Sequence, residues 1–419
     1  MNRTLSLYTR IVGGVLLLMA LLLNSCMRTD RLDDSPTRTV LVYMSAYNNL
    51  DQMGYANTNI RQMGLSLSNG RIMDHSNLLV FCHRKYGPST LMHIEGYNKV
   101  DTIRVYDSVN SCDPAVLNEV IRYVKDEWPA EVYGMIMWSH GTGWLPKDKL
   151  HYIAPNLKYA PSRDGNSIVG GTVIGQISEP MTKAFAMNDV PKGQNPPYDC
   201  MELDEMVGAI PDGFFDYIAF DACYMGCVEV AYALRHKCNY MISSPYEILA
   251  NGYPYSIVTR DFLNGNLLKA CREFYEHYST MGDRTLRMAG ISLVKTDGLD
   301  SLARCFRKIT ADFRDSIPLM DIRKLQRYDT FDNHVMFDIQ DYIDKLGPRK
   351  EYKDEFALQL NRCVLYKIST QYVFPCDDKE IEIKTFSGLS AYIPISKYES
   401  PGLNADYRKT EWGKATSFY

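Results

Sequence analysis

The chain has 419 residues and a formal net charge of −4, with 46 basic and 50 acidic residues mixed along its length. This length suits a large α/β domain with additions, because one small core cannot organise so many residues. The basic residues form no stripe of the kind that nucleic acid binding requires, so nucleic acid is excluded as an expected partner.

The first 26 residues have the pattern of an export signal. Two arginines precede an uncharged run at 11–23, which is too short to span a membrane and typical of a secretory signal. The run ends in Leu23-Asn24-Ser25-Cys26, which resembles a bacterial lipobox. We therefore expect lipid on Cys26, a polar tether at 27–38 and a protein held to the cell envelope, on its periplasmic or outer face. An ordinary cleaved signal peptide and an uncleaved anchor are the alternatives.

Short apolar runs alternate with helical patterns along the rest of the chain, which predicts a mostly parallel sheet flanked by helices. The clearest helix begins at Asp113-Pro114, an N-cap followed by proline at the first helical position. Six runs have the length and composition of buried strands, at 40–44, 78–82, 135–138, 217–220, 240–243 and 288–294.

A histidine follows the third of these runs, in Ser139-His140-Gly141-Thr142-Gly143, where the glycines would let a substrate backbone approach. The fourth run leads into Asp221-Ala222-Cys223, and a helical pattern begins soon after Gly226, which places Cys223 on a strand-to-helix turn. Ligands of open α/β sheets bind beyond the carboxyl ends of the strands, and a helix N-terminus favours thiolate. Taken singly, a buried structural cysteine and a simple turn histidine are the alternatives.

Together these motifs resemble the clostripain family of cysteine peptidases, which are caspase-like enzymes with a His-Gly after one core strand and an Asp-x-Cys after the next. The opening run and loop at 39–51 resemble the family's first strand, and the resemblance covers 39–255 well and the remainder loosely. It implies a caspase-like α/β core at 39–296, catalysis by Cys223 and His140 without a cofactor, and an oxyanion hole made by the backbone N–H groups of Gly141 and Cys223. His140 would maintain the Cys223 thiolate, which attacks a peptide carbonyl to give an acyl-enzyme that water hydrolyses.

Substrate preference is predicted by the same resemblance. Clostripain-like enzymes prefer Arg or Lys before the cut bond, and a buried cation needs a paired charge. Asp221 matches one acidic pocket position, Asn251 stands where relatives have a second acidic residue, and Glu247 could replace the missing charge. We therefore expect a moderate preference for Lys or Arg. The alternative is a neutral pocket in which Asp221 only caps the turn and Glu247 is solvated.

Residues 145–200, called the insertion below, are rich in Pro, Gly, Asn, Ser and Lys and show little periodicity, which is typical of a functional or mobile loop. A short helix is expected next, at 201–210. In the clostripain family the corresponding region is often cut to activate the precursor, whereas the alternative is an uncut surface insertion. Basic candidates for such a cut are Lys147, Lys149, Lys158, Arg163, Lys183 and Lys192.

The C-terminal part, 297–419, is expected to form a smaller α+β extension, with a boundary near Thr296. It opens with a helical apolar stripe from Leu299 to Phe313 and continues with helix-like and strand-like segments at 356–368 and 388–395. We see no candidate chemistry in these segments.

No obligatory metal is expected, because no run resembles a calcium loop. The eleven cysteines are scattered along the chain and lack the regular spacing of a disulfide framework. Cys223 and Cys227 are the one pair whose spacing admits a disulfide or metal, and a disulfide there would abolish the proposed chemistry. The rival to the cysteine peptidase interpretation is a non-catalytic envelope lipoprotein that holds a peptide or protein partner in the same cleft. The presence of both His140 and Cys223 favours the enzyme. The pocket position occupied by Asn251 and the long insertion favour the non-catalytic lipoprotein.

Overall fold

The computed structural model describes residues 37–68, 76–153, 185–190, 198–373 and 380–416. The expected signal peptide, the lipid attachment site Cys26 and most of the expected tether lie outside these residues, as do Lys158, Arg163, Lys183 and Lys192. None of the helices in the described ranges is long and apolar enough to cross a membrane.

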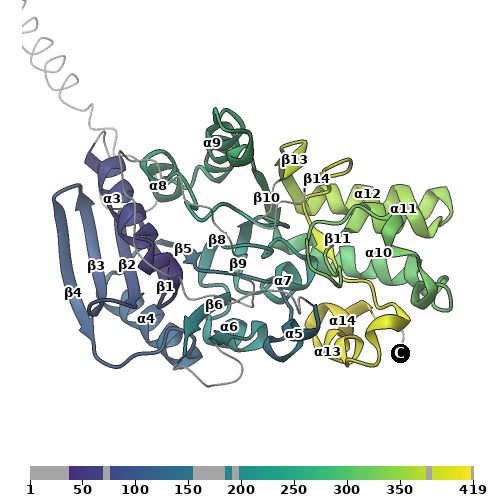
Figure 1. The fold of residues 1–419 in the computed structure, drawn as a ribbon. Helices are drawn as coiled ribbons and strands as arrows, with labels where there is room; N and C mark the ends of the chain where they lie inside the picture. Colours follow the sequence, from purple (N-terminus) through teal and green to yellow (C-terminus); the bar gives the residue numbers. More distant parts are fainter. Residues whose placement is uncertain (1–36, 69–75, 154–184, 191–197, 374–379, 417–419) are drawn as a thin grey trace, which may run out of the picture. The chain divides into compact units, whose positions relative to one another are not determined.

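The protein is built around a nine-stranded, mostly parallel sheet flanked by helices, which confirms the predicted fold class (Figure 1). The strand order is β12-β10-β9-β8-β5-β1-β2-β3-β4. Five central strands are parallel: β1 (Arg38–Ala46), β2 (Asn77–Arg84), β5 (Val132–Trp138), β8 (Phe215–Asp221) and β9 (Cys238–Ser243). Antiparallel strands extend both edges: β3 (Ser89–Gly96), β4 (Lys99–Tyr106), β10 (Gly290–Lys295) and β12 (Val364–Ser369).

The six predicted strands correspond to β1, β2, β5, β8, β9 and β10. Alternate residues of a strand point to opposite faces, so Leu41 and Tyr43 of β1 pack into one apolar cluster while Val40 and Val42 pack into another. Because helices cover both faces, the central strands are continuously apolar rather than alternating.

Helices α3 (Tyr55–Ser68), α8 (Tyr255–Leu263) and α9 (Leu267–Ser279) contribute to one cluster, and α4 (Pro114–Glu127), α6 (Leu203–Ala209), α7 (Val228–Ala233) and α10 (Leu299–Ala311) contribute to the other. The predicted start of α4 is confirmed, since the Asp113 carboxylate accepts a hydrogen bond from the N–H of Ala115. The short helix expected after the insertion is α6.

The insertion contains regular structure that its composition did not indicate. Strands β6 (Phe185–Asp189) and β7 (Tyr198–Met201) pair antiparallel, and α5 (Leu150–Ile153) follows a 3₁₀ turn at Lys147–Lys149. Another short helix, α2 (Asn49–Gln52), follows β1.

The C-terminal residues do not form a separate body, because Arg38–Tyr419 make one compact unit. Strand β12 belongs to the main sheet, and the α10 stripe packs in the same cluster as α7, so the boundary expected near Thr296 divides no compact units. The other elements of this part are β11 (Phe337–Asp338), α11 (Ile339–Leu346), α12 (Lys350–Cys363), β13 (Tyr372–Val373), β14 (Ile381–Glu382), β15 (Ser390–Ala391), α13 (Leu403–Lys409) and α14 (Glu411–Thr416).

Candidate active site

The two sequence motifs meet at the carboxyl edge of the sheet. Strands β5 and β8 are parallel neighbours whose register pairs Trp138 with Asp221, so the loops that follow them leave the sheet side by side. The N–H of Ser139 donates to the carbonyl of Asp221 at 3.3 Å, which extends the pairing by one residue into the loops. His140 and Cys223 therefore start from adjacent positions.

Gly141 allows the closest approach of the two loops. A β-carbon at this position would lie 2.5 Å from the carbonyl oxygen of Cys223 and 3.1 Å from the β-carbon of Ala222. No side chain fits in that space, so only glycine lets the loop of His140 lie against the backbone of the Cys223 loop.

Cys223 lies on a sharp turn and its side chain is partly buried. The next residue, Tyr224, has a φ of 59°, in the left-handed region that a bulky residue seldom adopts, and such strain is often found at functional turns. Helix α7 begins only at Val228, and the N–H of Ile248 donates to the Cys223 sulfur at 3.4 Å. An N–H group directed at a sulfur atom favours the thiolate. In this fold that N–H group belongs to Ile248, in the loop after β9, and not to a helix N-terminus.

His140 is 8% exposed, and burial lowers its pKa to about 4, because the charged imidazolium loses hydration. Its ring is therefore neutral near pH 7. The Nε2 atom lies 2.9 Å from Oδ1 of Asn49, the first residue of α2. An amide oxygen only accepts, so this assignment of the amide places the proton on Nε2 and leaves Nδ1 as the basic nitrogen.

Asn49 is a site residue that the sequence reasoning missed, although it lies within the opening 39–51 segment. It is separated from His140 by 91 positions in the chain. In the structure the hydrogen-bond partner of the imidazole Nε2 is this amide oxygen.

Asp221 ends β8 and is 3% exposed. Its Oδ2 accepts hydrogen bonds from the N–H of Tyr253 at 3.1 Å and the hydroxyl of Tyr255 at 2.8 Å. Its buried Oδ1 has no hydrogen-bond partner among the residues that the structure describes. Burial raises the pKa of Asp221 to about 6, against which the two hydrogen bonds act.

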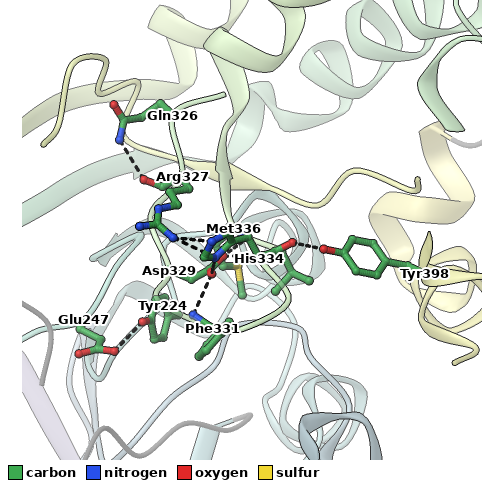
Figure 2. Close-up of polar contacts among 10 residues, drawn as sticks. Tyr224, Glu247, Gln326, Arg327, Asp329, Phe331, His334, Met336 and Tyr398 are labelled. Carbon is green, nitrogen blue, oxygen red and sulfur yellow. Dashed lines mark hydrogen bonds and ion pairs between the residues drawn. The ribbon is translucent and has the colours of Figure 1, made fainter. Parts of the chain in front are cut away.

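The pocket loop, Ser243–Tyr255, carries the other two predicted pocket residues. Glu247 is 5% exposed, and its carboxylate accepts a hydrogen bond from the hydroxyl of Tyr224 at 2.7 Å (Figure 2), so it is buried and not solvated. Asn251 is exposed, and its backbone carbonyl accepts from the side chain of Asn59 at 3.1 Å. Asp221 is thus two residues from Cys223 in the chain, and Glu247 is hydrogen-bonded to Tyr224, the residue after Cys223. Asn251 lies at the surface.

A C-terminal segment that looked featureless in the sequence, 329–336, also reaches the site; we call it the Asp329 loop. The fully buried Asp329 carboxylate accepts hydrogen bonds from the N–H groups of Val335 at 2.8 Å and Met336 at 2.6 Å. Its Oδ1 also lies at hydrogen-bond distance, 2.8 Å, from Nδ1 of His334 (Figure 2). The ring of Phe331 packs against that of Tyr224, with centroids 5.1 Å apart.

The Asp329 loop also holds the start of the insertion. Asn333 donates from its backbone N–H to the carbonyl of Ile153 at 3.0 Å and from its side chain to the carbonyl of Tyr152 at 2.6 Å. The Asp329 loop therefore contacts both Tyr224, the residue after Cys223, and the last described residues before 154–184.

No disulfide joins Cys223 to Cys227 or any other pair of the described cysteines. Within the same ranges no group of three or more His, Cys, Asp or Glu side chains could hold a metal ion.

The comparisons with known proteins agree with this geometry. Residues 42–166 and 170–407 match the clostripain family. Clostripain from Hathewaya histolytica is 28% identical over 140 residues, which are 33% of this chain and 21% of that protein, so the chain matches about a fifth of that relative.

Solved structures match over almost the whole chain. An inactive zymogen of a C11 protease from Parabacteroides distasonis has a TM-score of 0.73 and 28% identity, covering 91% of this chain and 98% of that one. A secreted C11 cysteine protease from Bacteroides thetaiotaomicron, bound to an irreversible peptide inhibitor, has a TM-score of 0.70 and 25% identity over 91% and 99%. The family match spans most of the chain and the predicted cysteine peptidase is confirmed: the chain belongs to the clostripain family of cysteine peptidases.

Proposed function

We propose that the protein is an endopeptidase in which Cys223 is the nucleophile, His140 is the base and Asn49 orients the imidazole. The observation that carries the proposal is the contact at Gly141, which holds the loop of His140 against the backbone of Cys223. The low pKa of His140 supports its role, because a neutral imidazole can accept the thiol proton on Nδ1.

The reaction follows from these groups. Proton transfer from the Cys223 thiol to His140 gives a thiolate, which adds to the peptide carbonyl. The imidazolium then donates its proton to the leaving amine, the C–N bond breaks, and an acyl-enzyme remains that water hydrolyses with His140 again as base.

We assign the oxyanion hole to the backbone N–H groups of Gly141 and Cys223. The N–H of Gly141 makes no hydrogen bond within the described part of the chain, so it is available to a ligand. Its closeness to the Cys223 backbone supports a shared site, because two converging N–H groups stabilise a developing oxyanion.

A preference for Lys or Arg before the cut bond is the second part of the proposal. Asp221 stands two residues before the nucleophile, and one of its buried oxygens has no hydrogen-bond partner among the described residues. Glu247 precedes Ile248, whose N–H reaches the Cys223 sulfur. Two buried carboxylates near the nucleophile favour a cationic substrate side chain, because a buried cation needs a paired charge. Asn251 supplies no charge, which keeps the expected preference moderate.

We further propose export and anchoring through lipid on Cys26, supported by the signal pattern of residues 1–26 and by the similar Bacteroides protease being secreted. Activation by a cut in the insertion is supported by the similar Parabacteroides structure being a zymogen. Labelling with a lipid precursor in cells tests the anchor, since Cys26→Ser would abolish the label. Measuring the intact mass of the protein before and after activity appears would locate the cut in the insertion.

The peptidase proposal is tested with fluorogenic peptides ending in Lys, Arg, Gln or Leu. We expect Cys223→Ala and His140→Ala to lower kcat/KM at least about a thousandfold, because the covalent route is lost. Cys305→Ala, at a half-buried free thiol on α10, is the matched control and should keep full activity. Undiminished cleavage by Cys223→Ala would refute the nucleophile, and equal cleavage of Lys and Gln peptides would refute the preference.

A further inference from the structure

A polar cavity of about 540 Å³ lies at the carboxyl edge of the sheet, outside the site described above. Its walls come from the loop after β1, the end of β2, the loop after β4, and the β6–β7 pair. Its lining includes Tyr47, His83, Lys85, Tyr106, Asp107 and Asn188.

The cavity lies on the histidine side of the catalytic pair. The strand order from the nucleophile runs β8, β5, β1, β2 (Figure 1), so a path from Cys223 past His140 reaches the loop after β1 and then the end of β2. Asn49, which holds His140, is two residues from Tyr47, and the Tyr47 ring stacks on His83 with centroids 5.0 Å apart.

This position has a consequence for substrate binding. The imidazolium must lie beside the amine that leaves, because it donates the proton to that nitrogen. Residues after the cut bond therefore continue from His140 away from Cys223, toward β1 and β2. We propose that the cavity is a subsite for those residues and that it takes a lysine or arginine side chain. This inference rests on the proposed peptidase mechanism.

The charges of the wall select a cation. Two basic side chains line the cavity, but Arg84 is paired with Asp51, which lies outside the lining, and Lys85 is paired with Asp189. His83 adds no positive charge near pH 7, because burial lowers its pKa to about 4. Exposed Asp107 makes no ion pair with any described residue, so its charge is available to a ligand.

The wall is also preformed. Ser111 Oγ lies 2.6 Å from Ser45 Oγ and 2.8 Å from His83 Nδ1, and Asn188 donates to Asn110 Oδ1 at 2.6 Å. Tyr106 lines the cavity and is 6% exposed, and its hydroxyl has no hydrogen-bond partner among the described residues. These hydrogen bonds fix the side chains of the wall before a ligand arrives, so binding costs little side-chain entropy. The Tyr106 hydroxyl is then an available hydrogen-bonding group in a preformed subsite.

The test uses quenched peptides that are identical up to the cut bond, with lysine or glutamine at the first, second or third position after it. Fluorogenic amides, which have no residue after the cut bond, serve as comparators. We expect lysine at one of the three positions to raise kcat/KM about fivefold over glutamine through a lower KM, as a partly exposed ion pair would, and the gain to shrink with added salt. Asp107→Asn should remove the gain and leave the fluorogenic amides unchanged.

Asp101→Asn is the matched control, because Asp101 is an exposed acid of β4 outside the lining, and it should keep the gain. Equal cleavage of lysine and glutamine peptides by the wild type would overturn the subsite. An Asp107→Asn variant that loses the same factor on the fluorogenic amides would also overturn it. If neither the peptides nor the fluorogenic amides are cleaved, the peptidase proposal itself fails. The other outcomes test only the subsite and leave the peptidase proposal intact.

Discussion

The backbone of Gly141 lies so close to Cys223 that a β-carbon on residue 141 would come within 2.5 Å of the Cys223 carbonyl oxygen. This contact joins two loops that are 82 residues apart in the chain and that carry His140 and Cys223, the proposed base and nucleophile. The distance between His140 and the sulfur is therefore controlled by a position that has no side chain.

Gly141→Ala should separate the two loops and lower kcat/KM about a hundredfold, since displacing a catalytic group by about 1 Å costs that much. The matched control is Gly208→Ala in α6, where an added β-carbon meets no atom within 4 Å. Kinetics and melting temperature measured together check the prediction. A folded Gly141→Ala variant with wild-type kcat/KM would contradict it.

Asn49→Ala should lower kcat about tenfold or more and change KM little, because the ring of His140 loses the partner that sets its tautomer. Asn49→Asp should instead raise the pKa of His140 from about 4, since a carboxylate stabilises the imidazolium. The acid limb of the kcat/KM profile would then move to higher pH. Asn98→Ala, in the exposed turn after β3, is the control. An unchanged profile in Asn49→Asp would refute the contact.

The preference for Lys over Gln should fall as the pH drops through about 6, because Asp221 takes up a proton there and loses its charge. Kinetics from pH 5 to pH 8 with the two peptides check this. In Asp221→Asn the preference should be small at every pH. A Lys preference that is equally large at pH 5 and pH 8 would exclude Asp221 as its source.

Asp221 also makes stability depend on pH. Its folded-state pKa is raised, so between its usual value near 4 and about 6 the folded chain binds more protons than the unfolded chain. The free energy of unfolding should therefore decrease as the pH rises through this window, and Asp221→Asn should lack this decrease. Urea titrations at several pH values measure the slopes. Identical slopes in both proteins would contradict the assignment.

Asp329→Ala should lower the free energy of unfolding by about 3 kcal/mol, because it leaves backbone N–H groups of the Asp329 loop without an acceptor inside the protein. Activity should fall too, since Phe331 packs on Tyr224, the residue after the proposed nucleophile Cys223. Asp315→Ala, at an exposed position after α10, should change stability by less than about 0.5 kcal/mol. Equal urea midpoints for the two variants would exclude the supporting role.

Local patterns in the chain predicted much of this architecture. Six apolar runs became six strands of one sheet, and the Asp113-Pro114 start of α4 formed as expected, because burial on both faces and helix capping leave short-range signatures. The same logic placed His140 and Cys223 just past neighbouring strand ends. These are the features that the sequence by itself determined.

Tertiary structure alone decided which partners those residues have. The amide of Asn49 meets His140 across 91 positions, Glu247 is buried against Tyr224, and the Asp329 loop joins the nucleophile turn to the insertion. None of these contacts has a periodic pattern or a fixed spacing, because side chains from distant segments meet only once the sheet and its loops are packed. The physical reason is that local propensity sets where strands and helices form, whereas the chemistry of the site depends on long-range packing at the edge of the sheet.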